Sequence, residues 1–172
     1  MSDVKAKRKS GIPTGNSGEY FVMGELLRRE YDAQLADRNT AGYDLLVGRA
    51  KDPTLTKVQI KTVRTAPWYV KQAAFKDPAM LEQITIYVLL GKLGTVVPVR
   101  YFIARNFDLA GQEQISPNWK DNAFMPYRTL VPYEDRWDML TDDIESRLTG
   151  GTGVKPDGTL RVYDAGLSTM RD

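Results

Sequence analysis

The sequence predicts a mixed α/β fold within one domain, and three observations carry this prediction. Residues 19–31 repeat apolar side chains at helical spacing. Residues 43–47 and 57–63 have the pattern of two neighbouring strands joined as a hairpin. Residues 84–90 are continuously apolar and rich in β-branched side chains, which suits a strand covered on both faces. With 172 residues, of which 42% are hydrophobic, the chain is long enough for one complete core.

The elements around these segments follow in order along the chain. Ser17 or Asn16 is the expected N-cap of the first helix. A short strand is expected at 33–36, and turn-forming residues follow at 39–42. Residues 96–103 are the expected partner of the buried strand, and Pro98 restricts them to a sheet edge or a bulge because proline donates no ladder hydrogen bond. Residues 64–76 fit no single element, and the proline-containing segment 106–133 predicts loops.

A second amphipathic helix is predicted after Pro132. Its apolar positions are Trp137, Leu140, Ile144 and Leu148, and glycines at 150, 151 and 153 end it. The tail beyond it predicts a short hairpin around 156–158. We therefore expect a basic flexible arm at 1–17, one domain at 18–148 and a C-terminal tail at 149–172. Helix, mixed sheet and helix is the expected coarse order.

The composition excludes several kinds of chemistry. The chain has no His and no Cys, so it cannot form a Ser-His-Asp triad, a Cys-His nucleophile or the usual zinc centres. Catalysis would then depend on carboxylates, lysine, hydroxyl groups or a hard metal ion. The net charge of +2 is too small to indicate nucleic acid by itself. Without cysteines or a long apolar run, we expect a cytoplasmic protein that enters no membrane.

Asp44, Gln59 and Lys61 form the most informative polar group of the sequence. Gln59 and Lys61 are two residues apart on one strand and therefore share a face. If Asp44 pairs opposite them, a carboxylate, an amide and an ammonium converge. Such a group can hold a hard divalent cation and set an ammonium beside a phosphate, which suits phosphodiester hydrolysis. The plainer interpretation is a solvated polar face of an ordinary hairpin, with Lys61 as an exposed strand lysine.

Glu19 adds a fourth polar group. It lies on the same helical stripe as Val22, Met23 and Leu26, so its carboxylate is expected to face the protein interior. An unpaired charge there costs several kcal/mol unless it is neutralised. A metal ion or Lys61 would supply the missing partner.

Several runs of the sequence carry a resemblance to a known family. They are Gly18-Glu19, Leu26-Leu27-Arg28-Arg29, Asn39-Thr40-Ala41-Gly42-Tyr43-Asp44-Leu45-Leu46-Val47, Val58-Gln59-Ile60-Lys61-Thr62 and Arg136-Trp137-Asp138-Met139-Leu140. Together they resemble the PD-(D/E)XK nuclease superfamily, and most of all its small members related to intron-encoded homing endonucleases and Holliday-junction resolvases. The resemblance is strong over 17–64 and thinner over 84–103.

This resemblance implies a restriction-endonuclease-like αβββαβ core, with a four-stranded mixed sheet flanked by helices, that hydrolyses DNA with Mg²⁺, for which Mn²⁺ would substitute. Asp44 matches the metal-binding aspartate, Lys61 the motif's lysine and Glu19 an additional acid on the helix. Gln59 stands where a second acid is usual, and Tyr43 stands where the motif has proline. An amide lowers the charge of the site by one, although its oxygen can still serve as a metal ligand.

The resemblance also implies ligands and partners. The expected metal ligands are Asp44, Gln59, the main-chain carbonyl of Ile60 and Glu19. The expected nucleic-acid contacts are Lys57, Thr62, Arg64, Lys7, Arg8 and Lys9, although the last three also fit a merely solvated arm. DNA is the expected partner, bound by a homodimer or a higher symmetric oligomer. Two other interpretations remain: a catalytically inactive DNA-binding or assembly subunit with the same fold, and an α/β protein with a fortuitous motif.

Overall fold

A computed structural model of the chain describes residues 11–37, 39–49, 55–141, 152–154 and 160–162. Its elements, in chain order, are α1 (Ile12–Leu27), β1 (Tyr31–Leu35), β2 (Leu45–Arg49), β3 (Thr56–Val63), β4 (Trp68–Lys71), α2 (Ala73–Lys76), α3 (Pro78–Leu81), β5 (Ile84–Leu89), β6 (Arg100–Arg105), α4 (Asn106–Leu109), β7 (Asn122–Met125), α5 (Tyr127–Leu130), the 3₁₀ helix η1 (Val131–Tyr133), β8 (Thr152–Val154) and β9 (Leu160–Val162).

The main sheet has five strands in the order β1-β2-β3-β5-β6. Only β3 and β5 run parallel, and the other neighbours are antiparallel, so the sheet is mixed as predicted. The first helix, the next three strands, the short helices and β5 reproduce the expected αβββαβ order. The fifth strand, β6, extends the predicted four-stranded sheet at one edge. It begins at Arg100, beyond Pro98, which agrees with the restriction that this proline imposes.

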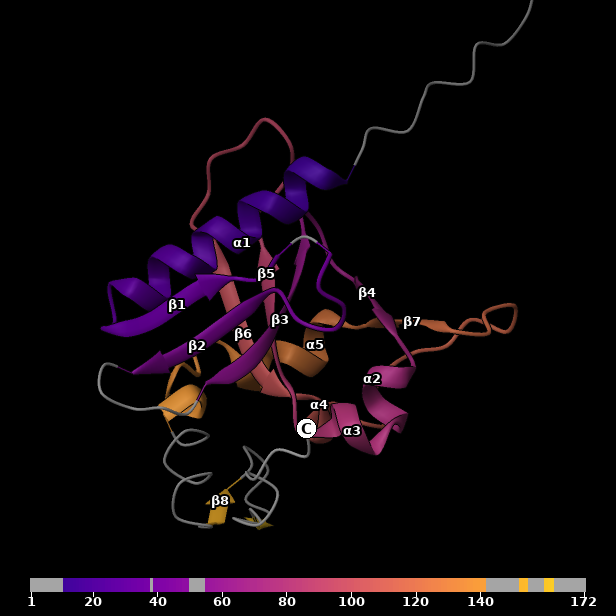
Figure 1. Cartoon of the computed structure of the whole chain (residues 1–172). Helices are drawn as coiled ribbons and strands as arrows, with labels where there is room; N and C mark the ends of the chain where they lie inside the picture. The colour runs from indigo at the N-terminus through magenta and orange to yellow at the C-terminus, as the bar shows by residue number, and fades with distance from the viewer. Residues whose placement is uncertain (1–10, 38, 50–54, 142–151, 155–159, 163–172) are drawn as a thin grey trace, which may run out of the picture.

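Helices cover both faces of β3. On one face, Gly18 of α1 lies directly against Thr62. On the other face, Lys61 lines a small cavity together with Phe75 of α2 and Met80 of α3. Figure 1 shows α1 crossing the sheet, well apart from the short helices α2 and α3. Successive side chains of β3 therefore lie in two different environments, one under α1 and the other near α2 and α3.

Trp68 anchors the segment that follows β3 to the middle of the sheet. Its side chain is fully buried and meets Tyr87 and Phe102 edge-on, at ring-centroid distances of 5.9 and 5.6 Å. Its indole nitrogen donates a hydrogen bond to the carbonyl of Val88 on β5 (3.1 Å). The strand that Trp68 begins, β4, pairs with β7 in a separate two-stranded sheet, here called the ribbon.

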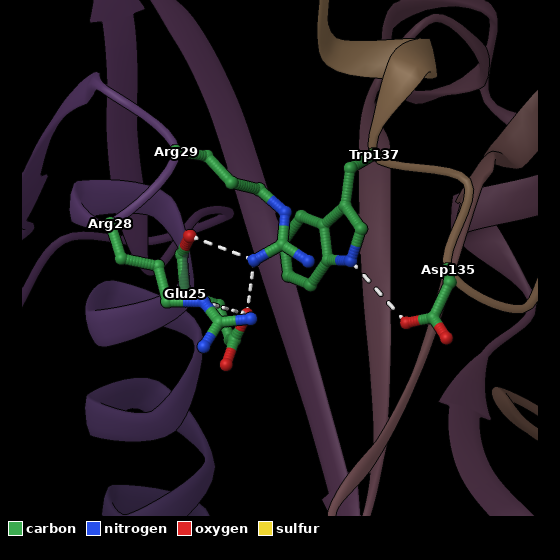
Figure 2. Close-up of polar contacts among 5 residues, drawn as sticks. All are labelled: Glu25, Arg28, Arg29, Asp135 and Trp137. Atoms are coloured by element: carbon green, nitrogen blue, oxygen red, sulfur yellow. Dashed lines mark hydrogen bonds and ion pairs between the residues drawn. The ribbon is translucent and has the colours of Figure 1, made fainter.

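The closing segment packs against the end of α1 (Figure 2). The guanidinium carbon of Arg29 lies 4.4 Å from the centroid of the Trp137 ring, and Arg29 also pairs with Glu25. Arg28 reaches the same carboxylate (3.1 Å), while the Trp137 indole donates to Asp135 (3.4 Å). These contacts are consistent with cation–π packing that joins the two ends of the described domain.

Several sequence expectations need correction. α1 begins at Ile12 with a proline in its first turn, so residues 12–17 belong to the helix and not to an arm. Ser17 is therefore not a cap; its hydroxyl donates to the Thr14 carbonyl inside the helix (2.9 Å). The early strand lies at Tyr31–Leu35, two residues before its expected start. The unassigned segment 64–76 contains β4 and α2, and the segment 106–133, where loops were expected, contains α4, β7, α5 and η1.

The predicted C-terminal helix and tail hairpin lie only partly within the residues that the structure describes. A helix starts at residue 138, and Leu140 is buried, whereas Ile144 and Leu148 lie outside the described residues. β8 and β9 pair antiparallel where the tail hairpin is predicted, and the predicted turn at 156–158 lies outside the described residues. The domain boundaries stay a prediction. No helix in the described part of the chain combines the length and apolar character that crossing a bilayer requires.

Candidate active site

Asp44 lies where β2 begins, between two neighbouring strands. Its main-chain nitrogen donates to the Val58 carbonyl of β3, and its carbonyl accepts from Ala36 just beyond β1, both at 2.9 Å. The β2–β3 register pairs Leu45 with Val58, and continuing it by one residue sets Asp44 opposite Gln59. The sequence expectation that the aspartate faces the Gln-x-Lys strand therefore matches this register.

The carboxylate of Asp44 takes the place of a strand partner for β3. Its Oδ2 accepts a hydrogen bond from the main-chain nitrogen of Ile60 (2.6 Å) and another from Nε2 of Gln59. The N–H and C=O of one strand residue point to the same side. The carbonyl of Ile60 is therefore directed toward the same edge as Asp44, as the predicted ligand set requires.

The chemistry of the carboxylate fixes the orientation of the Gln59 amide. An ionised carboxylate only accepts hydrogen bonds, so the amide presents its NH₂ group to Asp44. Among the described residues, Asp44 Oδ1 and Gln59 Oε1 take part in no hydrogen bond. The pair therefore leaves two oxygen atoms, one anionic and one neutral, for a further ligand.

Glu19 reaches the site from α1. It is half-buried and lines a cavity of about 260 Å³ with Asp44, Tyr43 and Thr40. Sequence reasoning missed Asp37, which lines the same cavity seven residues before Asp44 in an irregular segment. Even so, the described residues contain no group of three His, Cys, Asp or Glu side chains close enough together to hold a metal ion. A cation here would need amide or carbonyl oxygens in addition to carboxylates.

Lys61 lies on the opposite side of the Asp44–Gln59 contact. It is half-buried and lines a second cavity of about 60 Å³ with Gln59 and Lys71. Burial lowers the pKa of the Lys61 ammonium; the Asp44 carboxylate opposes this shift and the Lys71 ammonium adds to it. The structure thus joins Glu19 to Asp44 in one cavity and Gln59 to Lys61 in the other, with the Asp44–Gln59 hydrogen bond between the two cavities.

The residues expected to contact nucleic acid differ in their exposure to solvent. Lys57 is exposed, with its ammonium 5.1 Å from the centroid of the Tyr43 ring, and Arg64 is half-buried. The hydroxyl oxygen of Thr62 is buried where Gly18 packs on it and has no hydrogen bond among the described residues, which does not favour a contact with DNA. Lys7, Arg8 and Lys9 lie outside the described residues. Trp68 belongs to the core, whereas Tyr69 is 67% exposed.

Comparison with solved structures identifies the class of fold. The chain is similar to a bacterial homing endonuclease, with a TM-score of 0.51 and 12% identity over 80% of this chain and 96% of that one. The Holliday junction resolvase Hjc of Archaeoglobus fulgidus gives a TM-score of 0.46 and 14% identity, over 73% of this chain and 93% of the resolvase. No protein-family model and no curated protein sequence matches the chain.

The chain therefore shares the fold of this homing endonuclease, which agrees with the mixed α/β fold that the sequence resemblance implies. Within that fold, its candidate site has the particular form of an aspartate hydrogen-bonded to a glutamine, with a lysine two residues further along β3.

Proposed function

We propose that the protein is a divalent-metal-dependent DNA endonuclease that hydrolyses phosphodiester bonds with metal-activated water. The observation that carries this proposal is the position of Asp44, whose carboxylate contacts both Gln59 and the main chain of Ile60 at the start of β2. A half-buried lysine and a second carboxylate, Glu19, line the cavities on either side of that contact. Supporting it further, the fold is shared with a homing endonuclease.

The donor set fits Mg²⁺. Asp44 Oδ1, Gln59 Oε1, the Ile60 carbonyl and the Glu19 carboxylate are all oxygen ligands, which hard cations prefer. When bound, the ion would supply a nucleophilic water and stabilise charge on the phosphate oxygens. Mn²⁺ prefers similar ligands and would substitute for it.

Lys61 gives the site its positive side chain. No hydrogen bond or ion pair to its ammonium occurs among the described residues, so it can meet a phosphate oxygen without breaking an existing contact. Because burial lowers its pKa, the neutral amine is also more accessible than in a solvated lysine. Lys61 therefore has two available roles: as a cation beside the phosphate or as a proton acceptor for the attacking water.

Cutting both strands of a duplex in one binding event calls for two active sites. We propose that the protein acts as a homodimer or a higher symmetric assembly on DNA, since one chain offers one such site. Symmetric pairing of identical subunits is the commonest way to present two sites to a two-fold substrate.

One observation favours a second candidate function, that of an inactive DNA-binding or assembly subunit. Gln59 supplies an amide where a second acid is usual in the superfamily, and that amide already engages Asp44. A site with this lower charge binds cations more weakly. The two functions differ in whether the chain itself cleaves DNA.

Nicking of supercoiled plasmid DNA with Mg²⁺ separates the two functions. The unaltered chain should cleave, whereas Asp44→Ala and Lys61→Ala should lower the rate by about 100-fold or more. Asp32→Ala and Lys92→Ala change exposed residues elsewhere and serve as matched controls. Full cleavage by both site variants would refute the proposed active site. DNA binding by the unaltered chain without any cleavage would establish the inactive subunit instead.

A further inference from the structure

The β4–β7 ribbon has two chemically different faces. Trp68 and Val70 of β4 are buried, as are Ala123 and Met125 of β7. Their neighbours point the other way, because side chains alternate along a strand. In the ribbon register, Tyr69 pairs with Phe124 and Lys71 pairs with Asn122. We call Tyr69, Lys71, Asn122, Phe124 and the adjoining Trp119 the ribbon face.

The aromatic side chains of the ribbon face form a supported platform. Tyr69 is 67% exposed, and its ring centroid lies 5.9 Å from that of Trp119 at an angle of 42°. Trp119 in turn meets Phe124 edge-on at 6.0 Å. Phe124 thus supports Trp119, Trp119 packs against Tyr69, and the Tyr69 side chain stays largely in solvent. An ordered, exposed aromatic ring loses little conformational freedom when a planar ligand stacks on it.

The ribbon face also carries a positive charge next to the platform. The Lys71 ammonium donates to the neutral Asn122 side chain (2.7 Å), and within the described part of the chain it pairs with no carboxylate. Lys120 is exposed as well, but it lies before the start of β7 and next to an acidic residue, Asp121. Lys71 is therefore the ribbon's candidate for a phosphate contact.

The ribbon face is continuous with the candidate active site. Lys71 ends β4 and lines the same cavity as Gln59 and Lys61. Tyr69 lies two residues before Lys71, about 7 Å along the strand. A DNA strand whose phosphate lies at Lys61 would accordingly pass the lysine of the ribbon and then its aromatic platform.

We propose that the ribbon face binds an unpaired nucleotide of the DNA strand that enters the site, with its base stacked on Tyr69 and its phosphate at Lys71. This inference rests on the proposed nuclease function. In a paired duplex the faces of the bases are stacked on one another, and only their edges reach a protein. An aromatic platform therefore accepts bases that are not stacked in a helix, and such stacking tolerates any base identity. The substrate class is DNA with unpaired nucleotides beside the bond that is cut.

Tryptophan fluorescence provides a direct test in the full-length chain. Of its three tryptophans, Trp68 is fully buried and Trp137 is 7% exposed, so Trp119 is the one on the ribbon face. A short single-stranded oligonucleotide is titrated in EDTA, where metal-dependent cleavage does not occur. We expect saturable quenching, and Trp119→Phe should abolish it. An unchanged spectrum at saturating oligonucleotide would overturn the proposal.

Substitutions on the ribbon face measure its contribution to affinity. Tyr69→Ala should weaken binding of the single-stranded oligonucleotide roughly 5- to 150-fold, and binding of a blunt duplex by less than about 2-fold. Lys71→Gln should lower the salt dependence of binding by about one phosphate contact. Tyr20→Ala, at a tyrosine 60% exposed on α1, and Lys92→Gln, in the exposed segment after β5, are the controls. The inference would be contradicted if Tyr69→Ala and Tyr20→Ala lowered the affinity for the single-stranded oligonucleotide equally. It would also be contradicted if Tyr69→Ala lowered the affinity for the duplex as much as that for the single strand.

A parallel assay keeps this inference separate from the function on which it rests. Cleavage by the unaltered chain with Mg²⁺ is measured beside the binding titrations, on plasmid DNA and on a duplex that carries a single-stranded branch. Absence of cleavage on both substrates refutes the nuclease function, whatever the ribbon binds. If the chain cleaves DNA but Tyr69→Ala leaves its affinity for the single-stranded oligonucleotide unchanged, only the proposal for the ribbon face is refuted.

Discussion

Gly18 of α1 packs against Thr62 of β3 so closely that the helix lies directly on the strand. A Cβ atom at Gly18 would stand 2.7 Å from both Cβ and Cγ2 of Thr62, well inside normal van der Waals contact. This close approach brings the next residue, Glu19, to the cavity that it shares with Asp44. A glycine in a helix interior, which is otherwise unfavourable, thus serves the geometry of the site.

Gly18→Ala should force α1 away from β3. We expect a loss of about 1–3 kcal/mol in the free energy of unfolding, because the added methyl group overpacks a buried contact. Cleavage should fall as well, since Glu19 moves with the helix. Urea denaturation gives the first quantity. The matched control is Gly24→Ala, in the same helix, where a Cβ meets nothing within 4 Å; it should stabilise the chain by roughly 0.5–1 kcal/mol. Equal effects of the two substitutions would disprove this role of Gly18.

Glu19→Gln should weaken the binding of Mg²⁺ without abolishing Mg²⁺-dependent cleavage. The substitution keeps the shape of the side chain and takes one negative charge from the cavity that Asp44 also lines. We expect the Mg²⁺ concentration for half-maximal cleavage to rise about 10-fold or more, with a smaller change at saturating Mg²⁺. Initial rates across a Mg²⁺ titration measure this. Glu30→Gln, at an exposed residue just beyond α1, should leave the titration unchanged. An unchanged titration for Glu19→Gln would remove Glu19 from the ligand set.

Gln59→Glu should make stability depend on the metal ion. Without a cation, the new carboxylate cannot donate to Asp44 and repels it, so we expect a loss of about 1–3 kcal/mol in EDTA. Mg²⁺ should recover most of that loss, because a ligand that binds the folded state raises the melting temperature. Thermal unfolding with and without MgCl₂ tests this, and Gln34→Glu, at an exposed position of β1, is the control. A variant that Mg²⁺ stabilises no more than the unaltered chain would argue against a cation at this site.

Lys61→Met should stabilise the protein while abolishing cleavage, because it removes a half-buried ammonium. At pH 7 the gain should be of the order of 1 kcal/mol, or roughly 2–4 °C in melting temperature for a chain of this length. The pKa of folded Lys61 is lowered from 10.5, so the folded chain releases this proton at lower pH than the unfolded chain. Between the two pKa values the unfolded state binds more protons, and the unaltered chain gains stability as pH rises. The advantage of the Lys61→Met variant should therefore shrink from pH 7 to pH 10, which urea unfolding at both pH values measures.

Lys61→Arg separates the two roles open to this lysine. Arginine stays charged at every accessible pH. If the side chain acts as a cation, the variant should keep part of the cleavage rate and the same pH profile. If the neutral amine takes a proton, the rate of the unaltered chain should rise through the lowered pKa, and the variant should lose that rise.

The predictable part of the fold came from segments with strong local patterns. The buried strand at β5, the β2–β3 hairpin and the αβββαβ order follow from alternation and apolar runs, which the sheet retains. The start of α1 was missed because residues 12–17 have no apolar periodicity; Pro13 was the available signal for a helix start. The ribbon was missed because β4 and β7 lie about fifty residues apart and each has only four residues. Pairings this distant leave little trace in a local pattern.

The same limit applies to the site. The strand period correctly set Gln59 and Lys61 on one face, and the register sets Asp44 opposite Gln59. That period says nothing of which face a helix covers, so the burial of the Thr62 hydroxyl under Gly18 was not foreseeable from β3 alone. Nor could composition distinguish Trp68 from its neighbour Tyr69: one is fully buried and the other is largely exposed, a difference that arises from strand alternation and the distant partner β7.

The anchoring of Trp68 has a consequence for where DNA would be cut. Its indole is hydrogen-bonded to Val88 on β5, which pairs in parallel with the strand that carries Lys61. The base of the ribbon and the strand that carries Lys61 are thereby fixed to the same sheet. The spacing between the ribbon and Lys61 would therefore be fixed. A nuclease built in this way would cleave at a constant number of nucleotides from the first unpaired base, whatever the sequence between that base and the bond that is cut.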